Sequence, residues 1–325
     1  MTRIAYILAA SHSGSTLLSL LLGSHPQVAT IGEMNLSSQA MGNLDGYRCS
    51  CGCLIRTCDF WQKIQAGMAR RGLVFDLANA GTDYRSIESR FARRLLGPLH
   101  RRRFLEAVRD MGLGLSGAWC RQLPEKHRRN TALAALVAET ARAEVIVDSS
   151  KSAVRLKYLL RNRELDVKVI RLLRDGRAVA LTYMDPAGFA DAQDPARRAG
   201  GTGGLRTDER LSMARAAYDW RRCVEEADNL LRRLDRSRWI EVRYEDYCAA
   251  LGEVLARLHR FLGVAPAQPP TAFRTAAQHV VGNGMRLDMT SQVVLDERWK
   301  SVLTAEELRV FDRIAGQVNR RYGYH

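Results

Sequence analysis

The sequence predicts an α/β fold, a P-loop-like parallel β-sheet flanked by helices and carrying a helical insertion. Four short apolar runs have the composition of buried strands: Ile4–Ala10, Glu144–Val147, Val167–Leu173 and Trp239–Val242. Helix-compatible stretches separate these runs, and strands that are apolar along their whole length are typical of a parallel sheet covered on both faces. With 325 residues, 46% of them hydrophobic, we expect one domain over residues 1–325.

The first half of the chain follows this pattern with one long interruption. The first strand ends in a cluster of small polar residues, after which the apolar run Thr16–Leu22 predicts a helix. Val28–Ile31 is a weaker, fifth strand. The segment from about Phe60 to Ala143 is rich in arginine and has no clear strand pattern, so we expect a helical insertion that shapes a substrate site.

The second half contains a glycine-rich gap. Residues 185–206, with four glycines among Gly200–Gly204, fit neither helix nor strand, so we expect a flexible loop there, which is a lid, a binding loop or a disordered segment. Apolar periodicity and helix-end signals predict three helices downstream: Thr207–Leu234, Glu253–Leu262 closed by Gly263, and a last helix opened by a capping box of Thr304 and Glu307.

The net charge of +15 favours anionic partners such as nucleotides, phosphorylated or sulfated substrates, nucleic acid or a membrane surface. The basic residues are spread along the chain without an aromatic-interleaved patch, so nucleic acid is not the expected partner. Ser11, His12 and Ser13 interrupt the N-terminal apolar run, and no stretch approaches the ~20 apolar residues of a membrane helix. We expect a cytoplasmic, soluble protein whose charge permits peripheral membrane contact.

Four of the seven cysteines are crowded into RCSCGCLIRTC, at Cys49, Cys51, Cys53 and Cys58. The spacing C-x-C-x-C-x4-C differs from the zinc-finger pattern, and the local sequence contains no histidine as a fourth ligand. The default interpretation is a loop of thiols or of a local disulfide, and a metal site is the alternative. The other three are expected to be structural thiols: Cys120, Cys223 and Cys248.

Residues 10–18, ASHSGSTLL, have the layout of a phosphate-binding loop. Around Gly14 the chain must turn sharply, so that backbone N–H groups converge with the N-terminus of the next helix. The Ser15 and Thr16 hydroxyls offer further hydrogen bonds. The lysine of the nucleotide-binding pattern G-x-x-x-x-G-K-[ST] is absent. The loop therefore indicates an anion site, with an ordinary helix cap as the alternative.

A second basic position, in VIRLLRDGRAVALTYM, suits the same anion. Arg174 directly follows a predicted strand, where its guanidinium can pair with two oxygens of a phosphate. Thr182 lies about two helical turns later and can present its hydroxyl toward the same crevice. The alternative is a surface ion pair between Arg174 and Asp175, which would contribute little.

Five ordered motifs resemble the sulfotransferases that use 3′-phosphoadenosine 5′-phosphosulfate (PAPS). They are SHSGSTLL, the pair Gly32-Glu33, VDSSKSAVRL, RLLRDGRAVALT and VRYEDY. The chain looks most like the bacterial branch related to tyrosylprotein and carbohydrate sulfotransferases, from Ile4 to the C-terminal LDERWKSVL. The resemblance implies in-line transfer of a sulfuryl group to an acceptor hydroxyl of a carbohydrate, lipid, phenol, peptide tyrosine or other small molecule. The desulfated nucleotide (PAP) is then the product, and no metal is required.

The resemblance also implies a donor site built from both anion-binding segments. The first loop cradles the 5′-phosphosulfate, and Arg174 holds the 3′-phosphate together with Thr182, which replaces the usual serine. Tyr244 stands at the position of a donor-contacting tyrosine. The remaining donor-site residues are His12, Ser13, Gly14, Ser15, Thr16 and Leu17 in the loop, and Arg298, Trp299 and Lys300 in a segment that closes over the nucleotide.

Three catalytic groups follow from the same resemblance. Glu33 stands where the tyrosylprotein branch has its general base. His12 replaces an arginine or lysine that stabilises the leaving phosphate, which an imidazole does as a cation or as a hydrogen-bond donor. Lys151 shares this role. As in phosphoryl transfer, catalysis then depends on positioning and electrostatics.

Two other classes of function compete with this interpretation. A P-loop kinase or NTPase would use Asp148, which follows the apolar run EVIV as a Mg²⁺-binding aspartate does, but the Walker lysine is missing. A non-catalytic protein that binds anions or nucleic acid would account for the charge of +15. Binding of PAP rather than Mg-ATP separates the first rival from sulfotransfer.

Overall fold

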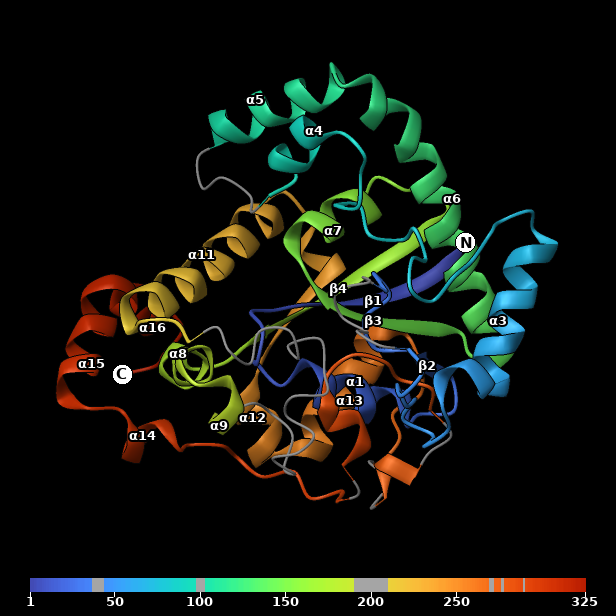
Figure 1. Ribbon diagram of the computed structural model, residues 1–325. Coiled ribbons are helices and arrows are strands. Elements are labelled where there is room, and N and C mark those ends of the chain that lie inside the picture. The colour runs from blue at the N-terminus through green and yellow to red at the C-terminus, as the bar shows by residue number, and fades with distance from the viewer. Residues whose placement is uncertain (37–43, 98–102, 190–209, 269–271, 276–277, 289) are drawn as a thin grey trace.

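The computed structural model describes residues 1–325 except 37–43, 98–102, 190–209, 269–271, 276–277 and 289. Among the described residues, five parallel strands form a sheet in the order β2-β3-β1-β4-β5 (Figure 1). They are β1 (Thr2–Leu8), β2 (Val28–Thr30), β3 (Val145–Lys151), β4 (Leu165–Leu173) and β5 (Trp239–Arg243). Each strand overlaps its predicted run, and the predicted α/β fold is confirmed.

Helices cover both faces of the sheet. They are α1 (Ser15–Gly23), α3 (Asp59–Arg70), α4 (Arg90–Leu95), α5 (Arg103–Gly114), α6 (Gly117–Ala141), α7 (Ala153–Leu159), α8 (Gly176–Met184), α9 (Pro186–Phe189), α11 (Met213–Leu231), α12 (Tyr244–Ala249), α13 (Leu251–Leu262), α14 (Trp299–Val302), α15 (Ala305–Phe311) and α16 (Gln317–Arg321). None of these described helices is both long and apolar enough to cross a membrane.

The central strand β1 shows how the two faces are filled. Its side chains alternate, so Ile4, Tyr6 and Leu8 pack in the cluster that holds α3, α6, α7 and part of α11. Ala5 and Ile7 point the other way and pack with α1, α12 and α13. In Figure 1, α6, α7 and α11 lie above the strands and α3 to their right, whereas α1, α12 and α13 lie below them.

The predicted helical insertion lies between β2 and β3. Its described residues form α3, α4, α5 and α6, of which α4 and α5 lie farthest from the sheet (Figure 1). The 25-residue α6 carries Pro124 in its first half and packs on α3 and the sheet through Leu133, Leu136 and Val137. The insertion therefore forms a helical layer over one face of the sheet.

The helix-end signals of the second half are largely confirmed. Gly263 ends α13 with a left-handed φ of 73°, and Thr304 and Glu307 form the predicted capping box at α15. The long helix was predicted to start at Thr207, but Arg210–Ser212 are not helical, and α11 starts at Met213 because Ser212 caps it. Part of the predicted loop at 185–206 is the short helix α9, while Gly200–Gly204 lie outside the described residues.

β3 extends four residues past its predicted end at Val147, through the polar run Asp148-Ser149-Ser150. These polar side chains are buried because the fold supplies their partners. Ser150 donates to Asp148 from both its backbone N (2.9 Å) and its hydroxyl (2.5 Å). A polar residue in a strand pattern normally predicts a solvent-facing position, so the sequence pattern predicted too early an end.

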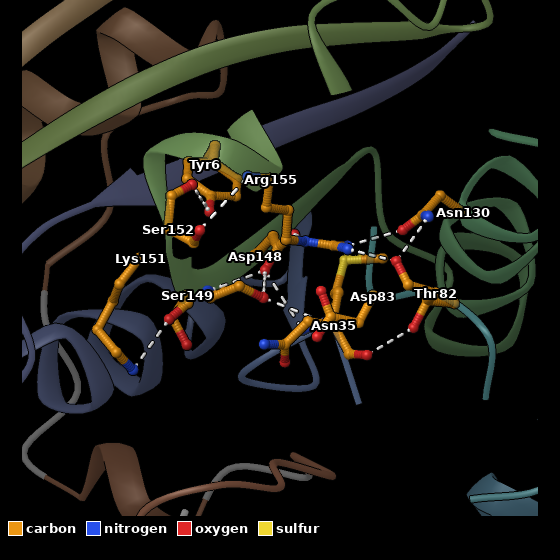
Figure 2. Close-up of polar contacts among 12 residues, drawn as sticks. Tyr6, Asn35, Thr82, Asp83, Asn130, Asp148, Ser149, Lys151, Ser152 and Arg155 are labelled. Carbon is orange, nitrogen blue, oxygen red and sulfur yellow. Dashed lines mark hydrogen bonds and ion pairs between the residues drawn. The ribbon is translucent and has the colours of Figure 1, made fainter. Parts of the chain in front are cut away.

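The strongest of these partners is Arg155 of α7. Its Nε donates to Asp148 Oδ2 at 2.8 Å, and both side chains are at most 2% exposed. The rest of the guanidinium donates to the Thr82 carbonyl at 2.9 Å and to Asn130 Oδ1 at 2.8 Å (Figure 2). Burial by itself would lower the pKa of Arg155, but the charge and hydrogen bond of Asp148, together with Tyr6 and Tyr84, outweigh it and raise the pKa. The pair thereby joins the end of β3 to the helical insertion.

We expect Arg155→Met to destabilise the protein by about 3–5 kcal/mol, because it leaves the buried Asp148 carboxylate without its cation. The measurement is the free energy of unfolding from a urea titration. Arg161→Met is the matched control, since Arg161 is 50% exposed where it pairs with Asp110, and its loss should cost less than about 1 kcal/mol. Equal losses in both variants would contradict the assignment.

Candidate functional site

The sequence-predicted site residues come together at the carboxyl ends of the central strands. From β1 the chain first builds β2 and β3 on one side and then β4 and β5 on the other, so the strand order reverses beside β1. Open parallel sheets bind ligands at such a reversal, outside the carboxyl ends of the strands. The predicted anion loop follows β1, Lys151 ends β3, and Arg174 directly follows β4. Topology therefore gathers the three segments at one edge.

Gly14 sets the shape of the anion loop. It precedes α1 with a left-handed φ of 84°, and no side chain caps the helix at this position. A Cβ atom on Gly14 would lie 2.2 Å from the Tyr247 hydroxyl oxygen and 2.6 Å from a ring carbon of Tyr244. Tyr247 instead donates to the Gly14 carbonyl at 3.0 Å. Only glycine satisfies both the backbone angle and this close approach, and the N–H groups at the start of α1 stay without a side-chain cap.

His12 and Arg174 join the two predicted anion-binding segments. His12 also has a left-handed backbone, with φ of 60°. Arg174 Nη1 donates to the His12 carbonyl at 2.7 Å, and the Arg174 guanidinium lies 4.4 Å from the centre of the Tyr244 ring. The His12 ring contacts Tyr183 edge-on at 5.8 Å. The other loop residues are buried at the start of α1, namely Ser13, Ser15, Thr16 and Leu17.

Two arginines converge on Asp296, a residue that the sequence analysis did not select. Arg174 Nη2 donates to Asp296 Oδ2 at 2.9 Å, and Arg298 donates to both carboxylate oxygens, at 2.8 and 2.9 Å. Burial raises the pKa of Asp296, but the Arg298 hydrogen bonds and the Arg174 charge outweigh it and hold that pKa well below its usual range. This position therefore accommodates an anion, which here is the carboxylate of Asp296.

Thr182 lies beside this cluster with its hydroxyl turned into the protein. Its Oγ1 is 3.2 Å from the Ala178 carbonyl and 3.3 Å from the Phe189 carbonyl, and Arg298 Nη2 donates to the same Phe189 carbonyl at 3.3 Å. Thr182 and Arg298 therefore share the Phe189 carbonyl as a hydrogen-bond acceptor, and Thr182 makes no hydrogen bond to Arg174.

The last two residues of the predicted closing segment have other partners. Trp299 lies under the Arg177 guanidinium, which is 4.0 Å from the ring centre. Lys300 pairs with Glu297 at 2.5 Å, and both of these side chains are about half exposed. The structure thus places Arg298 with Arg174, packs half-buried Trp299 against the core beside α8, and leaves Lys300 exposed.

Glu33 and Lys151 form an ion pair on the other side of β1. Gly32, with φ of 80°, turns the chain after β2, and a Cβ there would lie 2.3 Å from the Val281 carbonyl oxygen. Lys151 has a left-handed φ of 65° and directs its Nζ to Glu33 Oε1. The same Nζ donates to the Ser149 carbonyl at 3.3 Å (Figure 2). Both side chains keep some exposure, 16% for Lys151 and 13% for Glu33. Lys151 also pairs with Leu8 at the end of β1.

Asp148 does not have the environment of a Mg²⁺ ligand. Its side chain is 1% exposed, and Oδ2 accepts from Arg155. Its Oδ1 accepts from the N–H of Met34 at 3.2 Å and from both donor groups of Ser150. Both oxygens are therefore committed within the protein. This arrangement removes the observation that favoured a kinase or NTPase.

The cysteine-rich loop gains a partner that local sequence did not offer. Sγ of Cys49, Cys51 and Cys58 and a ring nitrogen of His279 all lie within 4.8 Å of one another. The seven cysteines are free thiols rather than disulfides. The expectation that no histidine lies near the loop is wrong in space, because His279 comes from more than two hundred residues downstream.

Sequence reasoning missed Tyr247, Asp296 and His279. Tyr247 stands three residues after Tyr244 in VRYEDY, a spacing that places both rings on one side of α12, so a signal for it existed. Asp296 stands inside LDERWK, a segment in which the sequence analysis selected Arg298, Trp299 and Lys300 but not the aspartate. His279 carries no local signal because its partners are distant in sequence.

The sequence matches a protein-family profile described as the sulfotransferase family over residues 5–268. Among solved structures, it is similar to the sulfotransferase domain from the curacin biosynthetic pathway, with 17% identity, a TM-score of 0.47 and coverage of 96% of this chain and 97% of that one. The sulfotransferase domain of the Synechococcus PCC 7002 olefin synthase is 17% identical, with a TM-score of 0.47 and coverage of 97% of this chain and 94% of that one. Sulfotransferase STF9 from Mycobacterium avium is 13% identical, with a TM-score of 0.46 and coverage of 96% of this chain and 75% of that one. A comparison with curated proteins finds no match.

Proposed function

Because this chain belongs to the sulfotransferase family, we propose that it transfers the sulfuryl group of PAPS to an acceptor hydroxyl, with PAP as the second product. The observation that carries this proposal is the contact of Arg174 with His12 and Tyr244. Through it, a basic group fit for a 3′-phosphate lies against a glycine loop fit for a 5′-phosphate. A nucleotide with phosphates at both positions is the ligand class that such a pair of sites selects.

The loop of residues 12–17 is the proposed seat of the 5′-phosphosulfate. The start of α1 offers N–H groups and the positive end of the helix dipole, because Gly14 provides no side-chain cap. His12 lies in the same loop, with its ring held against Tyr183. Tyr247 keeps the loop in its left-handed turn through the Gly14 carbonyl. The ring of Tyr244, sandwiched between this loop and Arg174, is the proposed contact with the donor.

The 3′-phosphate is proposed to bind at Arg174, with Thr182 and Arg298 as its further partners. Asp296 supplies the negative charge beside both arginines. Binding of the phosphate then replaces one anion by another, and neither guanidinium loses its compensating charge. Trp299 and Lys300 follow Arg298 directly, so they belong to the segment that rearranges when Asp296 moves.

Glu33 is the proposed general base. In the transfer step the acceptor oxygen forms a bond to sulfur, and the bond between sulfur and the bridging phosphate oxygen breaks. The acceptor proton passes to Glu33, and the electron pair of the broken bond stays on the 5′-phosphate. The loop N–H groups, His12 and Lys151 stabilise that developing charge. Lys151 also orients Glu33 through their ion pair.

The acceptor is proposed to be a small hydroxyl compound, whether carbohydrate, lipid or phenol, or a peptide tyrosine. Glu33 lies between the sheet and the segment that leads into the insertion, so the insertion helices are the proposed walls of the acceptor site. On this proposal residues 1–325 act as one catalytic domain, and the acceptor class is identified by screening with radiolabelled PAPS.

PAP should stabilise the folded protein, and Mg-ATP should not. At a PAP concentration of one hundred times Kd, linkage predicts a gain of about 2.7 kcal/mol. The measurement is the unfolding temperature with each nucleotide at equal concentration. Stabilisation by Mg-ATP without stabilisation by PAP would refute sulfotransfer and favour a kinase.

Glu33→Gln should lower kcat by about 10²- to 10⁴-fold, the usual contribution of a general base, while Kd for PAP stays within about twofold. Turnover is measured with radiolabelled PAPS and an acceptor from the screen. Glu253→Gln is the control, because Glu253 is an exposed carboxylate on α13. Unchanged turnover in Glu33→Gln would remove Glu33 from the catalytic role.

Asp296→Asn should tighten PAP binding by about tenfold, or about 1.4 kcal/mol, because the amide no longer competes as an anion for Arg174 and Arg298. Calorimetric titrations with PAP and with adenosine 5′-monophosphate measure the change. The gain should be confined to PAP, which carries the 3′-phosphate. Glu297→Gln, the adjacent exposed carboxylate, should leave both affinities unchanged. An equal gain for both nucleotides would contradict the assignment of Arg174.

A further inference from the structure

We propose that Cys49, Cys51, Cys58 and His279 bind one Zn²⁺ ion as a closed structural site. Three sulfurs and one imidazole nitrogen form a ligand set that zinc takes in structural sites, where all four positions are filled by protein. Their ligand atoms come from two distant segments and lie mutually within 4.8 Å. The site is separate from Arg174, His12 and the reacting groups, so this inference does not depend on the proposed function.

Three of the six distances between ligand atoms match a tetrahedral zinc site, and all six are within 4.8 Å. Cys51 Sγ lies 3.7 Å from Cys58 Sγ, and His279 Nδ1 lies 3.4 Å from Cys58 Sγ and 3.8 Å from Cys49 Sγ. With Zn–S bonds of about 2.3 Å and a Zn–N bond of about 2.0–2.1 Å, tetrahedral geometry separates two sulfurs by about 3.8 Å and a sulfur and a nitrogen by about 3.5 Å. A disulfide would instead bring two sulfurs to about 2.05 Å.

The backbone of the loop turns the first two cysteines toward a common point. Arg48 and Leu54 pair as the ends of a small antiparallel turn, in which Cys49 N donates to the Cys53 carbonyl at 3.0 Å. Gly52 makes the reversal with a left-handed φ of 86°, and its N–H donates to the Cys49 carbonyl at 2.9 Å. Cys58 stands directly before α3 without capping it by its side chain, so its thiol faces the cluster instead.

Ser50 holds His279 in place from both sides. Its backbone N donates to the Val280 carbonyl at 3.1 Å, and its hydroxyl donates to the Gln278 carbonyl at 2.8 Å. The Val280 N–H donates back to the Ser50 hydroxyl, also at 2.8 Å. The His279 ring stacks on Phe60 of α3 at 4.3 Å with an interplanar angle of 6°. The imidazole therefore has a set position and orientation relative to the two cysteines beside Ser50.

The surroundings also suit the charge of the loaded site. When three thiols bind Zn²⁺ as thiolates, three protons are released and the centre carries a net charge of −1. Arg286 lies beside it, because its Nε donates at 2.9 Å to the carbonyl of Arg48, the residue before Cys49. Its guanidinium is also 4.2 Å from the ring centre of Tyr47. Buried Cys49 and Cys58 shield one side of the centre, and exposed Cys51 leaves a path for the ion to enter.

The zinc site would connect the cysteine loop to the turn that follows β2. Next to His279, Val281 N donates to the Ile31 carbonyl at 3.0 Å, and Val281 pairs with Gly32 as an isolated parallel bridge. Gly282 N donates to the Tyr47 hydroxyl at 2.7 Å. The same few residues thus connect the cysteine loop to the turn that carries Glu33. The ion is therefore a structural one, with no part in bond making or breaking.

The test uses the full chain, produced in zinc-supplemented medium. Elemental analysis should find one zinc per chain, and X-ray absorption should find three sulfurs at about 2.3 Å and one nitrogen at about 2.0–2.1 Å around it. Cys58→Ser and His279→Ala should each lose the bound zinc. Cys53→Ser is the matched control, because Cys53 is an exposed thiol of the same loop that lies outside the ligand set. It should retain one zinc.

The wild-type chain provides a test that does not depend on the folding of a variant. After removal of zinc with a chelator, addition of Co²⁺ should produce the visible absorption of a tetrahedral cobalt–thiolate centre, and readdition of zinc should restore the unfolding temperature that chelation lowered. A chain that binds no zinc or cobalt, or a disulfide among these cysteines in the reduced protein, would overturn the proposal. Loss of zinc in Cys53→Ser with retention in Cys51→Ser would overturn the ligand assignment.

Discussion

The buried ion pair between Asp148 and Arg155 is the interaction on which the geometry of the site depends. A carboxylate and a guanidinium that are at most 2% exposed must have every polar atom satisfied, because an unmatched charge in the interior is costly. Arg155 meets this requirement through the insertion, and Asp148 meets it through Ser150 and the N–H of Met34. The residue before Met34 is Glu33, and the residue after Ser150 is Lys151. One buried pair therefore positions two predicted catalytic side chains and joins them to the insertion.

The part of the site around Arg174 depends on a second ion pair, in which Asp296 compensates the arginine charge. Arg174 is a 3%-exposed cation, and its partners are a carboxylate, a carbonyl and an aromatic face. On the function proposed above, a ligand phosphate binds at Arg174 only by replacing the Asp296 carboxylate. Such a replacement would make the affinity weaker than that of two arginines without a carboxylate partner, while both guanidinium groups keep a counter-charge throughout.

Sequence patterns predicted those elements whose formation is decided locally. The β strands and the closure of α13 at Gly263 follow from runs and end signals within a few residues. The start of α11 was placed six residues early because the helix-compatible pattern extends N-terminal to Ser212, the residue that caps the helix. The end of β3 was placed too early because its polar residues have buried partners, which lie on other segments. Both errors concern boundaries, where a local pattern competes with a specific hydrogen bond.

By itself, the sequence determined the α/β class, the glycine loop after the first strand, and the resemblance that led to Glu33 and Arg174. These depend on short-range periodicity and on motifs that are contiguous in the chain. Only the tertiary structure decided that Asp296 occupies the Arg174 site, that Tyr247 closes on Gly14, and that His279 completes the cysteine cluster. Each of these contacts joins residues more than a hundred positions apart. No spacing rule links such residues, because their proximity is a product of how the sheet is ordered and how its edge is packed.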